Sequence, residues 1–142
     1  MLCAAALASC ASPDPEAKSD SPVQTQGLGT PVPAAGETQA VATQDSDAAD
    51  DPAIWVDPQD RSRVVIFGTD KKAGLYTYDL SGKITGFLPD GLLNNVDLRD
   101  GFPTPAGTRV LVAASDRRRM GAALYLLDPS RTFHMAASWR GA

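Results

Sequence analysis

The hydrophobic positions of this chain gather in short runs along its second half. Glycine, proline, aspartate and serine separate the runs, which is typical of strands joined by turns. Ser81 and Gly82 are suited to one hairpin turn, and residues 129–131 to another. The pattern predicts an all-β fold with strands at residues 53–56, 63–68, 74–80, 83–88, 95–98, 108–114, 122–128 and 132–137.

The predicted strands fall into two similar sets of four. Val-Val-Ile-Phe-Gly-Thr-Asp-Lys at residues 64–71 matches Val-Leu-Val-Ala-Ala-Ser-Asp-Arg at residues 110–117, at a constant offset (110 − 64 = 46). Each copy is an apolar strand followed by a hydroxyl residue, an aspartate and a cation. A period in the forties with several short strands per unit is typical of β-propeller blades. Two ordinary hairpins of a β-sandwich are the alternative.

The first part of the chain has a different composition from the strand region. Residues 1–10 are small and apolar, and Leu-Ala-Ser-Cys at residues 7–10 resembles the lipobox of bacterial lipoproteins, with Cys10 as the lipid acceptor. An alanine-rich start without function is the alternative. Residues 11–44 are polar and proline-rich, which indicates a flexible tether ahead of a folded segment at 45–142. We therefore expect an exported protein, either a lipoprotein of the bacterial cell envelope (outer membrane or periplasm) or a secreted one.

Charge and reactive side chains exclude several functions. The formal net charge of -4 and the pI of about 4.8 argue against nucleic-acid binding, because no basic stripe is present to neutralise a phosphate backbone. Cys3 and Cys10 both lie in the leader, so the strand region has no thiol nucleophile. The single histidine, His134, is not part of an Arg-His-Gly sequence. Phosphatase chemistry based on a cysteine or histidine nucleophile is therefore not expected.

Four carboxylates lie within seven positions just before the first predicted strand, at Asp45, Asp47, Asp50 and Asp51. Carboxylates this close repel one another unless a cation or buried donors intervene, and a hard divalent ion is the usual answer. The helix-loop-helix calcium loop does not fit, since Asp50 would stand at its glycine position. A solvated acidic turn is the alternative.

The order of residues around this cluster resembles the β-propeller phytases. Asp-Ala-Ala-Asp-Asp-Pro-Ala-Ile-Trp at residues 47–55 is similar to the first signature of the family, and Asn-Asn-Val-Asp-Leu-Arg-Asp at residues 94–100 to the second. Thr-Asp-Lys-Lys-Ala-Gly-Leu-Tyr at residues 69–76 lies between them, and Ser-Asp-Arg follows at residues 115–117. With a Glu-Thr pair at Glu37, the resemblance covers residues 37–128.

This resemblance implies a six-bladed β-propeller in a longer parent protein, of which about two blades are present here. It implies a phytase that hydrolyses phosphate monoesters of phytate, or other inositol polyphosphates, with several calcium ions. Bound calcium would also explain how an acidic protein accepts a polyanion. The implied calcium ligands are Asp50 and Asp51, with Glu37 and Asp97 as weaker candidates, and the implied phosphate contacts are Lys71, Lys72, Arg117 and Arg99.

Two blades alone leave an open sheet edge and an uncovered apolar face. We therefore expect that this fragment is inactive and not stably folded alone. We also expect that the parent protein is a monomer. One alternative is a non-catalytic calcium-stabilised propeller module, which would keep Asp50 and Asp51 but would not need Lys71, Lys72 and Arg117. A nonfunctional remnant is another.

Overall fold

The computed structural model describes residues 29–30, 32–44, 47–128 and 133–140. The chain divides into a unit up to Pro33 and a second unit that begins at Ala34. All strands belong to the second unit, and no helix occurs among the described residues. The strands are β1 (Ala49–Val56), β2 (Val64–Asp70), β3 (Gly74–Tyr78), β4 (Ile84–Leu88), β5 (Leu93–Thr104), β6 (Gly107–Asp116), β7 (Gly121–Leu127) and β8 (Phe133–Arg140).

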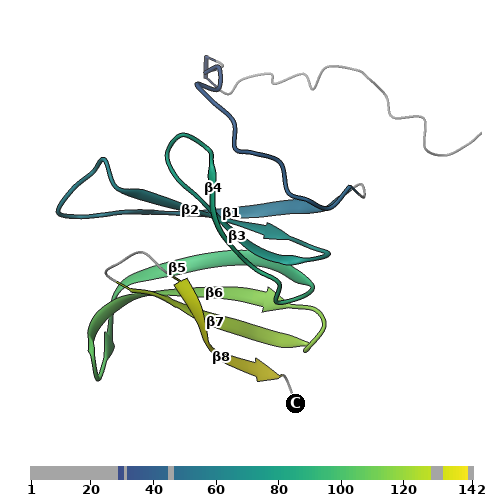
Figure 1. Cartoon of the computed structure of the whole chain (residues 1–142), viewed down its shortest axis with the longest axis vertical. Coiled ribbons are helices and arrows are strands. Elements are labelled where there is room, and N and C mark those ends of the chain that lie inside the picture. The colour runs from purple at the N-terminus through teal and green to yellow at the C-terminus, as the bar shows by residue number, and fades with distance from the viewer. Residues whose placement is uncertain (1–28, 31, 45–46, 129–132, 141–142) are drawn as a thin grey trace, which may run out of the picture. The chain divides into compact units, whose positions relative to one another are not determined.

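The strands form two four-stranded antiparallel sheets, in which sequence neighbours are also neighbours in space (Figure 1). The orders are β1-β2-β3-β4 and β5-β6-β7-β8, so the chain completes one sheet before it begins the next. A sandwich built on Greek-key connections would cross between its sheets, whereas propeller blades are complete in themselves. The prediction of an all-β fold with two four-stranded repeats is confirmed.

The packing of the two sheets follows the repeat. β2 buries Val65 and Phe67 in the common core, whereas β6 buries Val110 and Val112. In the repeat alignment Val110 and Val112 correspond to Val64 and Ile66, which lie on the other face of β2. The first repeat thus packs one face of its sheet against the second repeat, and the second repeat packs the opposite face of its own sheet against the first. Stacked blades pack in this way because the same contact can be repeated.

The core is continuous between the sheets. Phe67 and Leu75 from the first sheet and Leu93, Val112 and Tyr125 from the second are fully buried. The phenylalanine, leucine and valine side chains among them each contribute roughly 1.5–3 kcal/mol relative to exposure. This shared core fixes the two sheets relative to each other, and so fixes the loops at their ends.

Both repeats begin with a strand that is longer than the hydrophobic pattern predicts. β1 starts at Ala49 and β5 at Leu93, ahead of the predicted 53 and 95. In each strand the register shifts near the start, between Ala49 and Pro52 and between Leu93 and Val96. Such bulges place polar residues at the edge of a sheet, where periodicity gives no strand signal.

Part of the segment predicted as a tether contacts the first sheet. The Gln39 N–H donates to the Gly82 carbonyl at 2.7 Å, and the Ala42 N–H donates to the Tyr76 hydroxyl at 3.1 Å. Gly82 has a φ of 81°, and a Cβ there would lie 2.2 Å from the Glu37 carbonyl oxygen, so this turn needs glycine. The predicted lipidation site Cys10, the acidic Asp45 and the turn at 129–131 lie outside the described residues.

Candidate functional site

The predicted site lies at the end of the sheets where β2 and β6 finish and where β1 and β5 begin. The two bulges there are held by the hydroxyl residue of each repeat. Thr69 Oγ1 accepts the Asp51 N–H at 3.0 Å and donates to the Asn94 carbonyl at 2.6 Å. Ser115 Oγ likewise accepts the Asn95 N–H at 3.0 Å. The hydroxyl side chain that recurs in both repeats therefore hydrogen-bonds backbone groups of the bulges that have no partner on the neighbouring strand.

Asp51 links the two sheets directly. Its Oδ2 accepts the N–H of Val96, a buried residue of β5, at 2.8 Å. A carboxylate that accepts a backbone N–H makes a charge-assisted bond, which is about twice as strong as a neutral one. The carboxyl group of Asp51 is thus oriented across the boundary between the sheets.

Lys71 is held between two carboxylates. Its Nζ lies 2.6 Å from Asp47 Oδ1 and 3.1 Å from Asp50 Oδ1. The hydrogen bonds with Asp47 and then Asp50 raise the pKa of Lys71, and the hydrogen bond with Lys71 lowers the pKa of Asp47. The Lys71 N–H also donates to the Ala48 carbonyl at 2.8 Å, so both backbone and side chain are fixed.

Arg117 brings the cation of the second repeat to that of the first. Its Nη2 donates to the Lys71 carbonyl at 2.9 Å, and its own N–H donates to the Leu92 carbonyl at 3.0 Å. The charges of Lys72 and Arg117 also contribute to the lowered pKa of Asp47, after the hydrogen bond and charge of Lys71. The lowered pKa of Asp47 therefore reflects three of the predicted phosphate contacts, namely Lys71, Lys72 and Arg117.

Asp97 and Arg99 lie further along β5, opposite Ala113 and Leu111. Both line a shallow depression of about 160 Å³ on the second sheet. Asp97 also lines an open hollow of about 490 Å³ together with Asp51 and Ser115. The structure thus brings Asp97 to the same hollow as Asp51, whereas Arg99 lies outside it.

Glu37 lies at the other end of the first sheet. Its backbone contacts Gly82, in the turn between β3 and β4, and it lines a hollow of about 180 Å³ with Leu80 and Ser81. The turn that carries Lys71 joins β2 to β3, at the opposite ends of these strands. The backbone of Glu37 is therefore a strand length away from Lys71.

The donor atoms at this end suit a hard cation, since Asp47, Asp50 and Asp51 offer carboxylate oxygens. In the described part of the chain, however, no group of three or more histidine, cysteine or acidic residues is arranged to hold a metal ion. Lys71 neutralises Asp47 and Asp50 in this arrangement. These acids would therefore fit a site for a hard cation only together with further ligands.

A comparison with known protein families agrees with the repeat and the site motifs. A family model described as Phytase matches residues 1–135. The chain belongs to the phytase family. A 3-phytase of Bacillus subtilis (strain 168) is 47% identical over 90 residues, which cover 63% of this chain and 23% of the relative. The chain thus spans about a quarter of that phytase, in agreement with two blades of a larger propeller.

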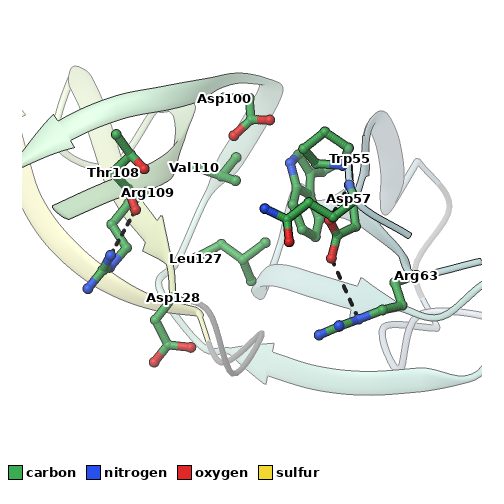
Figure 2. A pocket seen from close by; sticks show the side chains of 11 residues that line it. Trp55, Asp57, Arg63, Asp100, Thr108, Arg109, Val110, Leu127 and Asp128 are labelled. Carbon is green, nitrogen blue, oxygen red and sulfur yellow. Dashed lines mark hydrogen bonds and ion pairs between the residues drawn. The ribbon is translucent and has the colours of Figure 1, made fainter. Parts of the chain in front are cut away.

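A hollow of about 360 Å³ lies at the end of the sheets opposite to Lys71 and Arg117, and several of its lining side chains are drawn in Figure 2. Residues of both sheets line it, among them Trp55 from β1 and Val110 from β6. Arg63 Nε lies 3.6 Å from Asp57 Oδ2 at its rim. Trp55 and Asp100 belong to the two signatures, but none of the predicted calcium ligands or phosphate contacts lines this hollow, so the predicted site is elsewhere.

Two aspartates at the site were not singled out from the sequence as functional. Asp70 and Asp116 end β2 and β6 and are buried. Asp70 Oδ1 accepts the Lys72 N–H at 2.9 Å, and Asp116 Oδ1 accepts the Arg118 N–H at 2.9 Å. Their place in both copies of the repeat, just before the cations, is the signal that could have identified them as turn-forming groups.

Proposed function

We propose that this chain forms the first two blades of a longer calcium-dependent phytase, a six-bladed propeller that hydrolyses phosphate monoesters of inositol hexakisphosphate. The observation that carries the proposal is the convergence of Lys71 and Arg117, from two different blades, beside Asp50. Membership of the phytase family and the likeness to a protein named 3-phytase support the substrate class.

The cations have a defined task in this proposal. An inositol polyphosphate presents several phosphates on one ring, so cations on neighbouring blades can hold neighbouring phosphates. Arg117 would bind one phosphate with its planar guanidinium, and Lys71 and Lys72 would bind another as point charges. Arg99, further along β5, would contact a more distant phosphate. The bond from Arg117 to the Lys71 carbonyl keeps these cations together before substrate arrives.

The acids would hold calcium. Asp50 and Asp51 are the main ligands that we propose, with Asp97 as a weaker candidate, whereas Glu37, at the other end of the first sheet, would have to hold a separate ion. Bound calcium ions would neutralise substrate phosphate charge and lower the pKa of a bound water. Asp50 also pairs with Lys71, so it would keep the phosphate-binding ammonium next to the metal ligands. Asp51 would be held in place by the N–H of Val96.

The chain alone would be inactive, because its described residues hold no complete group of metal ligands. Further carboxylates would have to come from the rest of a propeller. A suitable test protein is therefore a chimera in which residues 34–140 of this chain, a stretch longer than the 90-residue match, replace the corresponding region of the Bacillus subtilis 3-phytase.

The test is release of phosphate from phytate by the chimera, by the chimera with Arg117→Gln, and by the chain alone. We expect hydrolysis by the chimera, a strong loss in the variant, and none by the chain. A chimera that binds calcium but releases no phosphate would favour the non-catalytic module. A folded chimera that neither binds calcium nor releases phosphate would contradict the proposal.

We also propose that the protein is exported and that Cys10 receives a lipid, which would anchor it to the cell envelope. Among the described residues no helix is long and apolar enough to cross a membrane. The test is labelling with a radioactive fatty acid in a bacterial host that expresses residues 1–142. Label that disappears with Cys10→Ala supports lipidation at this residue, and label that persists, or is absent from both, contradicts it.

A further inference from the structure

The turn between β6 and β7 carries three consecutive arginines, of which the function proposed above uses only Arg117. Arg119 is engaged differently from the other two. Its Nη2 lies 2.8 Å from Asp90 Oδ1, and its Nη1 donates to Asp116 Oδ2. One guanidinium therefore joins two carboxylates that are both buried, Asp90 in the link between the blades and Asp116 at the end of β6.

This ion cluster continues into the core of the second blade. The hydroxyl of Tyr125, in the centre of β7, donates to Asp90 Oδ2 at 2.6 Å, and Tyr125 itself is fully buried. Burial, and then the hydrogen bond to Asp90, raise the pKa of Tyr125. Asp90 is thus held from one side by Tyr125 and from the other by Arg119. The link between the blades is fixed to the β6–β7 turn by partly buried charge-assisted bonds.

The same cluster shapes the backbone around Arg117. Asp116 Oδ1 accepts the N–H groups of Arg118 at 2.9 Å and of Arg119 at 3.0 Å. The Arg117 N–H donates to the Leu92 carbonyl, two residues after Asp90. Asp116 therefore holds the two residues that follow Arg117, the link holds Arg117 itself, and Arg119 joins Asp116 to the link.

The first blade provides an internal comparison. Asp70 corresponds to Asp116 in the repeat and caps its turn in the same way, through the Lys72 N–H. The residue that corresponds to Arg119 is Ala73. Asp70 Oδ2 is buried without a hydrogen-bond partner among the described residues. A turn of this type therefore forms without the arginine, so Arg119 is a specific addition of the second blade.

We propose that Arg119 is a positioning residue that holds Arg117 toward Lys71, and so sets the distance between the two phosphate-binding cations. The inference rests on the proposed function for its catalytic consequence, but its structural part can be tested separately. Loss of Arg119 would leave Asp90 and Asp116 as buried carboxylates without a cation, and the turn would be free to move away from Lys71.

The test uses the chimera with Arg119→Gln, and Arg118→Gln as a control that removes an equal charge from the same turn. Hydrogen exchange measures the N–H groups of residues 117–119. We expect exchange at least about tenfold faster with Arg119→Gln and little change with Arg118→Gln. Unchanged exchange with Arg119→Gln would overturn the proposal, whether or not the chimera hydrolyses phytate. A chimera without phytase activity would contradict only the proposed function.

Kinetics then separate positioning from general stability. With Arg119→Gln, KM for phytate should rise about fivefold or more, whereas KM for a simple monophosphate ester should change little. In a chimera that already carries Arg117→Gln, the second substitution should have no further effect on KM. Additive effects would overturn the proposal. If Arg119→Gln does not fold, Tyr125→Phe removes one bond to Asp90 and should change exchange and KM in the same directions; no change would contradict the role.

Discussion

The guanidinium of Arg117 donates to the backbone carbonyl of Lys71 across the boundary between the two blades, at 2.9 Å. The two residues are counterparts in the internal repeat, so equivalent turns of successive blades meet at this point. Their side chains carry the cations that we assign to phosphate binding. A site made of one cation per blade can hold a ligand with several phosphates, which a single turn could not.

Substitution of Lys71 should affect substrate binding more than stability. In the chimera, Lys71→Ala removes an ammonium group from the phosphate site, and KM for phytate should rise about ten- to a hundredfold, as for the loss of one charge-assisted bond. The Tm should change little, because Asp47 is largely exposed and Asp50 partly exposed, so that water can replace the lost ammonium at both carboxylates. Steady-state kinetics and thermal melting of the same preparation measure both effects.

Lys83→Ala is the matched control, because Lys83 is an exposed lysine in the turn between β3 and β4, at the other end of the blade. It should leave KM unchanged. If Lys71→Ala lowers Tm markedly, and the rise in KM can be explained by loss of folded protein, the lysine has a structural role. The assignment to phosphate binding is then wrong.

Thr69 should be important for stability because it serves the bulge of both blades. Thr69→Val keeps the volume but leaves the Asp51 N–H and the Asn94 carbonyl without this partner. Since Thr69 is buried, the change should lower the free energy of unfolding by about 1–3 kcal/mol. Denaturant unfolding of the chimera measures it. Thr85→Val is a suitable control, because Thr85 is an exposed residue of β4 whose hydroxyl donates to Thr77 Oγ1 within the same sheet; equal losses would contradict the role given to Thr69.

The two tasks of Asp51 can be separated by two substitutions. Asp51→Asn keeps an oxygen that can accept the Val96 N–H, but it removes the charge that a calcium ion needs. Asp51→Ala removes both. We expect Asp51→Asn to weaken calcium binding with a small change in stability, and Asp51→Ala to cost in addition about 1–3 kcal/mol in the free energy of unfolding. Calorimetric titration with calcium and denaturant unfolding give the two quantities, and unchanged calcium affinity in both variants would exclude Asp51 as a ligand.

The fold was largely predictable because its signal is local and repeated. Apolar runs identified all eight strands, and the match of residues 64–71 to residues 110–117 gave the two units. The starts of β1 and β5 were missed, since the bulges consist of aspartate and asparagine residues without strand propensity. The sequence pattern reports side-chain alternation, and a bulge interrupts that alternation.

The proximity of several candidate residues could be predicted, but not the partners with which they pair. The repeat and the motifs indicated Asp50, Lys71 and Arg117, and the structure brings them together. The bond from Arg119 to Asp90 could not be predicted from the sequence, because the two residues are far apart in the chain and have no counterparts of the same type in the first repeat. Contacts of this kind depend on how the blades pack, which no local pattern records.

The stability of the β6–β7 turn should depend on pH in a definite direction. Burial acts to raise the pKa of Asp116, but hydrogen bonds from the Arg119 N–H and guanidinium outweigh it and leave the pKa lowered. A lowered pKa in the folded state contributes stability above the ordinary aspartate pKa of about 3.9, and this contribution is lost as the pH falls further. The Tm difference between the chimera and its Arg119→Gln variant should therefore be largest above about pH 4 and shrink below it. A constant difference down to about pH 2 would contradict this origin.

The central claim is that the acids at the end of the first blade help to hold calcium ions on which phytate hydrolysis depends. The most direct measurement is the initial rate of phosphate release by the chimera before and after treatment with a calcium chelator, and again after calcium is returned. We predict that the chelator abolishes the rate, that calcium restores it, and that Asp50→Asn shifts the restoring calcium concentration upward. Full activity in metal-free buffer would contradict the account.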